Sequence, residues 1–155
     1  RSTSAATLAN NGVRYRTHFV KAILDTNTGE VLSETQPEVM DVIEGNGNTF
    51  ALVRQGMTLV PSTISGKISS YPIAIACKTG TAQWQGTTST GSFSGSDHAS
   101  FVLYAPADDP EIAIAVYVER GSQGGNLANV CIPILDAYFS SSAKYETVAT
   151  ENIAY

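Results

Sequence analysis

Apolar side chains alternate most clearly between Glu111 and Glu119, where they occupy both faces of a predicted β-strand. One face takes Ile112, Ile114, Val116 and Val118, and the other takes Ala113, Ala115 and Tyr117. A strand that is apolar on both faces is typical of a sheet that is covered on both sides. We therefore expect this strand to be buried on both faces, with layers above and below it.

Two further strands are predicted before it, over residues 73–83 and 99–105. Only residues 106–110 join the second of these to the strand at 111–119. Such a short connection permits an antiparallel hairpin and excludes a parallel crossover. A separate hairpin is predicted between His18 and Leu32, with its turn at residues 27–29.

Helical spacing of apolar residues follows two asparagines, Asn48 and Asn126, that we expect to cap helices. The first helix is closed by Pro61, and the second contains Pro133, which should bend it. The apolar stripe of the second helix is Leu127, Val130, Cys131, Ile134, Leu135, Tyr138 and Phe139. A further helix is predicted to end near Asn11.

Three segments have no clear pattern. Residues 37–43 fit either a short helix or a strand, and residues 84–98 are predicted as a long loop. The chain after Phe139 is polar and is interpreted as a loose tail. We therefore expect an α+β fold, an antiparallel sheet flanked by helices, with one domain over residues 1–140 and a polar tail over 141–155.

Composition is that of a globular protein, with 43% hydrophobic and 15% charged residues among 155. The net charge of −5 argues against nucleic acid as the main partner, because phosphate neutralisation needs a basic surface. Cys77 and Cys131 are predicted to be buried free thiols. With His18 and His98 they lack the close paired spacing of zinc sites, so neither a metal nor a cofactor is expected.

The segment Lys78-Thr79-Gly80-Thr81 carries the candidate chemistry, at the end of an apolar strand. The Lys78 ammonium and the two threonine hydroxyls would supply donors and positive charge to a peptide carboxylate that adds along the sheet edge. Gly80 would allow close approach to the strand, and a backbone N–H near Thr81 could donate to a developing oxyanion. The alternative is that Lys78 is an ordinary solvated lysine on an edge strand.

The chain resembles the C-terminal half of penicillin-binding transpeptidases, especially the monofunctional class B kind, over about residues 3–139. The stretches that carry the resemblance follow the order of the family: TLANNG at 7–12, VRQGM at 53–57, KTGTAQ at 78–83, HASF at 98–101 with YAP at 104–106, and PEIAIAV at 110–116. Cys77 stands where the family often has glycine, and Ser100 where tryptophan is common. The resemblance implies the penicillin-binding and serine β-lactamase fold, incomplete in this chain.

The resemblance also implies a D,D-transpeptidase that cross-links peptidoglycan stem peptides through a serine acyl-enzyme and binds penicillins covalently. Lys78 would then assist electrostatics and proton relay, Thr79 and Thr81 would hold the carboxylate, and the Thr81 N–H would form half of the oxyanion hole. Gln83 shares the alternation of the threonines and Trp84 opens the following loop, so both are expected to contact substrate.

The nucleophile is the main departure from the family pattern. No Ser-x-Asn occurs, and the one Ser-x-x-Lys, at residues 141–144, follows the Lys-Thr-Gly motif instead of preceding it. It also lies in the polar tail, where nothing would desolvate its lysine. Because the chain also begins at Arg1 without methionine, we expect a fragment whose serine comes from an N-terminal half of the same domain.

Several alternatives stay open within and beyond this family. The chain could belong to a serine β-lactamase, to the β-lactam sensor domain of a receptor, or to a catalytically inactive structural homologue. The expected partners are the stem peptide, β-lactam antibiotics, the N-terminal half of the domain and other cell-wall synthesis proteins. The expected location is the extracytoplasmic face of the bacterial membrane, with an anchor outside this chain.

Overall fold

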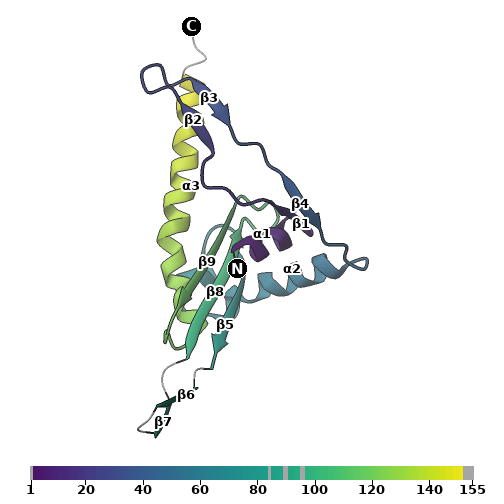
Figure 1. Ribbon diagram of the computed structural model, residues 1–155, viewed down its shortest axis with the longest axis vertical. Coiled ribbons are helices and arrows are strands. Elements are labelled where there is room, and N and C mark those ends of the chain that lie inside the picture. Colours follow the sequence, from purple (N-terminus) through teal and green to yellow (C-terminus); the bar gives the residue numbers. More distant parts are fainter. Residues whose placement is uncertain (1, 84, 89–90, 95–96, 152–155) are drawn as a thin grey trace.

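A three-stranded antiparallel sheet lies at the centre of the computed structural model, which describes residues 2–83, 85–88, 91–94 and 97–151 (Figure 1). Its order is β5 (Ala76–Ala82), β8 (His98–Ala105) and β9 (Ile112–Val118). The three predicted strands are confirmed, and so is the antiparallel hairpin between the last two. Within the described part of the chain β5 pairs with β8 alone, so its other edge is open.

Helices cover both faces of this sheet. Helix α3 (Ala128–Glu151) packs on one face, and helices α1 (Ser2–Ala9) and α2 (Thr49–Leu59) pack on the other. Alternation along β8 assigns the faces, because Phe101 and Leu103 point toward α3 while Tyr104 packs with the α1 and α2 residues. The predicted α+β architecture is therefore confirmed.

The main core lies between the sheet and α3. Its buried members come from all three strands and from the helix. Each large apolar side chain removed from water contributes about 1.5–3 kcal/mol to stability. Short 3-10 helices, η1 (Pro61–Thr63) and η2 (Lys67–Ser70), close the lower part of this core. The principal core residues are Ile68, Cys77, Phe101, Leu103, Ile114, Leu127, Cys131 and Leu135.

Strand β9 departs from the prediction that both of its faces are buried. Ile114 is buried against the α3 side and Ala113 packs against the smaller core under α1. Farther along the strand Ala115 and Tyr117 are exposed, because α1 extends over only the first part of β9. The assignment of side chains to the two faces was right, whereas burial of the second face along its whole length is wrong for this chain.

Helix α3 also differs from its prediction at both ends. Asn126 is not its cap, because the 3-10 helix η3 (Gly124–Leu127) precedes it and Gln123 stands at the start of that turn. Beyond Phe139 the backbone stays helical to Glu151 and is not a loose tail. No glycine or proline follows Pro133 in the sequence, so nothing interrupts the helix there.

The helix predicted after Asn48 is confirmed as α2, but the Asn48 side chain makes no capping hydrogen bond. Instead the Thr49 hydroxyl donates to the Asn46 carbonyl oxygen at 2.8 Å. Pro61 follows the helix as predicted and opens η1. The helix predicted near the N-terminus is confirmed as α1, which ends before the left-handed residue Asn11.

Two ribbons lie between α1 and α2 in sequence and extend away from the sheet (Figure 1). The predicted hairpin is confirmed as β2 (Ala22–Leu24) paired with β3 (Val31–Glu34). Its turn is fixed by the Asp25 carboxylate, which accepts hydrogen bonds from the backbone N–H groups of residues 27 and 28 at 2.8 and 2.9 Å. These contacts hold the pKa of the Asp25 carboxyl below its usual value.

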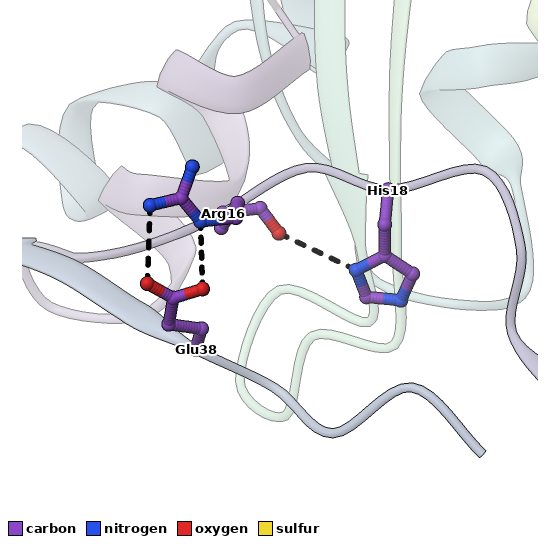
Figure 2. A network of polar contacts seen from close by, with 3 residues as sticks. All are labelled: Arg16, His18 and Glu38. Carbon is purple, nitrogen blue, oxygen red and sulfur yellow. Dashed lines mark hydrogen bonds and ion pairs between the residues drawn. The ribbon is translucent and has the colours of Figure 1, made fainter. Parts of the chain in front are cut away.

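The ambiguous segment at 37–43 contains a strand, β4 (Val39–Val42), which pairs with β1 (Val13–Tyr15). An exposed ion pair extends this pairing by one step (Figure 2). The Arg16 guanidinium donates to both Glu38 carboxylate oxygens, at 2.7 and 3.1 Å, while the Arg16 backbone N–H donates to the Glu38 carbonyl oxygen at 2.8 Å. His18 lies beside them, its Nδ1 3.4 Å from the Arg16 carbonyl oxygen.

The predicted long loop after β5 is wrong in part, because it contains a second hairpin. Strands β6 (Gln85–Thr88) and β7 (Gly91–Ser94) pair antiparallel and project past the end of the sheet (Figure 1). Both strands consist mainly of glycine, serine and threonine, so an analysis based on the spacing of apolar residues does not detect them. The position of Trp84 lies outside the described residues.

Candidate active site

A polar groove of about 510 Å³ lies where β5 leaves the sheet. Its wall on the sheet side is formed by Thr79 and Thr81, and the facing wall comes from η3 and the turn before it. The groove is lined by Thr63, Ile64, Ser65, Thr79, Thr81, Asp97, Gln123, Gly124, Gly125, Asn126 and Asn129. The hydroxyls of Thr79 and Thr81 therefore share this groove with side chains and backbone of residues 123–129, which lie more than 40 residues later in the sequence.

Chain topology explains why η3 reaches this groove. Because β8 is antiparallel to both β5 and β9, the ends of β5 and β9 lie at the same edge of the sheet. The segment that follows β9 is therefore delivered beside Thr81. The Gly124 backbone N–H donates to the Thr81 hydroxyl oxygen at 3.4 Å.

Lys78 occupies a different place from the two threonines. Successive side chains of a strand point to opposite faces, so Lys78 lies on the face away from Thr79 and Thr81. Its side chain is exposed, and its Nζ donates to the Thr79 carbonyl oxygen at 2.6 Å. The structure thus brings the threonines into the groove, whereas the catalytic role of Lys78 stays a prediction.

Gly80 lies directly opposite Ser100 in the pairing of β5 with β8. A Cβ atom on Gly80 would collide with the Ser100 Oγ. Glycine at this position is thus explained within this chain by its cross-strand neighbour. The backbone of Gly124 in η3 also rests on that of Gly80. The close approach of a ligand to Gly80, expected from the sequence, stays a prediction.

The turn between β9 and η3 holds backbone strain. Arg120 and Ser122 adopt left-handed φ values of 55° and 68°, which cost free energy for residues with a Cβ. Two hydrogen bonds to the start of β8 hold them. The Ser122 N–H donates at 2.9 Å to the carbonyl oxygen of Asp97, the residue before β8, and the Arg120 N–H donates to His98 Nδ1 at 3.2 Å. His98 also stacks on Tyr117, with the ring centroids 5.9 Å apart.

Two groups of groove residues were not among the predicted site residues. The first group is residues 123–126 with Asn129, which follow β9, and the second is residues 63–65, which precede β5. The order of antiparallel strands could have identified the first group. Gln83, which was predicted to touch substrate, is exposed just after β5 and is not among the groove-lining residues.

The two cysteines are free and buried, as predicted. Burial raises the pKa of the Cys77 thiol to about 12, and the nearby Cys131 thiol adds to this effect. Burial also raises the pKa of Cys131, to about 11. Both groups are therefore neutral thiols and are unsuited to act as nucleophiles.

Among the described helices, none combines the length and apolar content needed to cross a membrane.

The chain is similar in sequence to penicillin-binding proteins and D,D-transpeptidases. It is 30% identical over 159 residues to penicillin-binding protein 2A of Bacillus subtilis, covering 94% of this chain and 22% of that protein. It is 30% identical to the peptidoglycan D,D-transpeptidase MrdA of Acinetobacter baumannii, covering 91% of this chain and again 22% of the relative. The chain therefore spans about a fifth of the length of these relatives.

Solved structures give the same answer for the fold. Penicillin-binding protein A of M. tuberculosis, in its imipenem acyl-enzyme complex, superimposes with a TM-score of 0.69 at 25% identity, over 89% of this chain and 29% of that one. The family model described as the penicillin binding protein transpeptidase domain matches residues 2–135. The resemblance carried by KTGTAQ and its companion motifs is confirmed, and the chain belongs to the penicillin-binding protein transpeptidase domain family.

Proposed function

We propose that this chain is the substrate-strand portion of a peptidoglycan D,D-transpeptidase. The observation that carries the proposal is the open edge of β5, with Thr79 and Thr81 beside a polar groove. Such an edge accepts an extended peptide as an additional strand through main-chain hydrogen bonds. A stem peptide ending in D-Ala-D-Ala is a ligand of this form.

Each residue of the motif has a role in this proposal. The Thr79 and Thr81 hydroxyls donate to the terminal carboxylate, and the Thr81 backbone N–H donates to the oxyanion that forms at the scissile carbonyl. Lys78 supplies positive charge and a proton relay from the other face of the strand, toward a serine carried by another segment of the protein. Gln83 and Trp84 contact the substrate farther along.

The reaction requires an activated serine, and Ser65, which lines the groove, does not stand in a Ser-x-x-Lys sequence. A serine attacks the carbonyl of the D-Ala-D-Ala bond, the terminal D-alanine leaves, and the acyl group passes to an amine of a neighbouring strand. The motif at residues 141–144 is not proposed for this step. An N-terminal half of the same domain is the proposed source of the serine, and it is also the proposed partner that covers the exposed part of β9.

Names of the relatives support the same ligand class. MrdA of A. baumannii carries the name peptidoglycan D,D-transpeptidase, and penicillin-binding protein A was captured as acyl-enzymes with imipenem and penicillin G. We extend these properties to the present protein as β-lactam binding and action outside the cytoplasm, at the membrane face where peptidoglycan is assembled. Contacts with other cell-wall synthesis proteins are part of the same proposal.

Labelling of the full-length protein by a fluorescent penicillin tests the function. The wild type should form a covalent adduct that survives denaturation. Lys78→Ala should slow labelling by about a hundredfold or more, as for loss of a charged catalytic group. The matched control is Lys21→Ala, which removes an exposed lysine in the segment before β2 and should leave labelling unchanged.

Three outcomes would change the assignment. A wild-type protein that forms no adduct would be an inactive homologue. An adduct that hydrolyses within seconds would indicate a β-lactamase. Equal labelling of Lys78→Ala and wild type would remove Lys78 from the site.

A further inference from the structure

Gly124 is buried against the motif strand and touches two of its residues. Its N–H donates to the Thr81 Oγ1 at 3.4 Å, and both residues line the groove. A threonine hydroxyl has one O–H donor and two lone pairs. When one lone pair accepts the Gly124 N–H, the hydroxyl hydrogen remains available for an acceptor in the groove.

The backbone of Gly124 also rests directly on the strand. A Cβ atom at this position would lie 2.5 Å from the carbonyl oxygens of Gly80 and Ser100, and 2.8 Å from the Gly80 nitrogen. These are backbone atoms of two paired strands, so they cannot turn away as a side chain would. A residue larger than glycine at 124 must therefore push η3 away from β5.

The neighbouring glycine provides a contrast. A Cβ atom on Gly125 would meet only the Ile64 Cγ2, at an ordinary contact distance of 3.9 Å. Neither glycine adopts a left-handed φ, so alanine is acceptable to the backbone at both positions. The two glycines differ in their distance from the strand and not in conformational demand.

The turn that leads into Gly124 is also anchored at the start of β8, through Asp97, which lines the groove, and through His98. Its two left-handed residues are held by the bonds from Ser122 to Asp97 and from Arg120 to His98. These two hydrogen bonds therefore hold Gly124 in its place against β5. If η3 moved away from β5, the turn would have to break them before Gly124 could make a similar contact elsewhere.

We propose that Gly124 is a positioning residue for Thr81. Its N–H fixes the rotation of the Thr81 hydroxyl so that the hydroxyl hydrogen points into the groove. The absence of a side chain at Gly124 sets the short distance between η3 and β5. This inference rests on the proposed function, in which that hydroxyl donates to the carboxylate of the ligand. Gly124 touches no reacting atom and acts through Thr81. Its effect should therefore depend on whether the ligand carries a free carboxylate.

Acylation of the full-length protein by penicillin G and by the penicillin G methyl ester provides the test. Gly124→Ala should slow acylation by the acid about tenfold or more, the size expected for loss of a hydrogen bond to a charged group. Acylation by the ester should slow much less, because it has no anion for the hydroxyl to bind. Gly56→Ala, in α2 and outside the groove, adds a Cβ atom that meets nothing within 4 Å, so this control should leave both rates and their ratio unchanged.

A double-mutant cycle separates positioning from general damage. Thr81→Val should give the same loss with the acid, and Gly124→Ala should add nothing further in the Thr81→Val background. Equal slowing with acid and ester, or additive losses, would overturn the inference while leaving the proposed function intact. A wild type that neither compound acylates would overturn the proposed function, and this inference with it.

A second test of the positioning role changes the turn and does not add a side chain at Gly124. His98→Ala removes the acceptor for the Arg120 N–H and loosens the turn, so the ratio of acid to ester rates should fall, by less than in Gly124→Ala. His98→Asn restores an acceptor and should recover the ratio. If Gly124→Ala fails to fold, an unchanged ratio in folded His98→Ala would overturn the inference.

Discussion

Gly80 of β5 and Ser100 of β8 are cross-strand partners, and the Ser100 hydroxyl occupies the space that a side chain on Gly80 would need. The Ser100 Cβ lies farther away, at 3.7 Å from the Cβ position of Gly80, which is an ordinary contact. A side chain on Gly80 would therefore displace a single oxygen atom, the Ser100 Oγ. Gly124 approaches the same two residues from the groove side.

Gly80→Ala should destabilise the full-length protein by about 1 kcal/mol or less, because the Ser100 hydroxyl must rotate away from the added methyl group. The same substitution in a Ser100→Ala background should be neutral or stabilising by about 0.5–1 kcal/mol, since the oxygen is gone and alanine loses less chain entropy than glycine. Denaturant unfolding of the four proteins gives both values. Equal destabilisation in the two backgrounds would assign the glycine requirement to a different neighbour.

The strained turn after β9 gives a second prediction. Ser122→Gly should stabilise the protein by about 1 kcal/mol, because glycine adopts a φ of 68° without the steric cost that serine meets, and its N–H can still donate to Asp97. Thermal melting measures the change. Gln123→Gly is the matched control: Gln123 has an extended φ of −104°, so glycine there should destabilise. A decrease in melting temperature for Ser122→Gly would show that the turn holds no usable strain.

The strands of the central sheet could be predicted because their pattern is local. Alternation in residues 111–119 assigned Ile114 and Ala113 to opposite faces, and the structure agrees. The same pattern could not predict that Tyr117 is exposed. An apolar side chain can be buried, but its type does not show whether another element of the fold covers it. Coverage depends on the length of α1 and on where it crosses the sheet.

The groove shows the same limit in a functional site. Thr79 and Thr81 were identified from their motif, while Asn126 was interpreted only as a helix cap. Nothing in the local sequence around Asn126 indicates that it faces β5. That proximity comes from two antiparallel pairings, which deliver the end of β9 to the end of β5.

Reactivity of the cysteines provides a third prediction. Because the pKa of Cys77 is raised from 9.0 to about 12, its thiolate fraction at pH 8 is lower by about a thousandfold than that of a solvated thiol. Native protein should therefore react with a thiol-specific disulfide reagent only as fast as it unfolds, and two thiols should react at once in guanidinium chloride. Rapid native labelling of either residue would contradict the burial of the pair.

The same shifts predict how stability depends on pH. Both thiols have a folded-state pKa above their ordinary value of 9.0, so their contribution to stability is fully present below about pH 9 and is lost as the pH rises toward 11 and 12. The decline in unfolding free energy above pH 9 should be smaller in a Cys77→Ala/Cys131→Ala variant than in the wild type. An identical decline would assign the alkaline loss to other groups, such as Tyr71, whose pKa burial raises to about 12.

Helix α3 provides the last prediction, through two neighbouring residues that differ in burial. Leu135 is fully buried against the sheet, whereas Ile134 is 43% exposed, although both belong to the stripe predicted from the sequence. Leu135→Ala should cost about 2–5 kcal/mol, because it leaves a cavity in the core cluster that also contains Phe101 and Leu103. Ile134→Ala should cost less than about 1 kcal/mol, since solvent already reaches that side chain. Urea midpoints of the two variants check the difference, and similar losses would mean that the outer side of α3 is covered by another part of the folded protein.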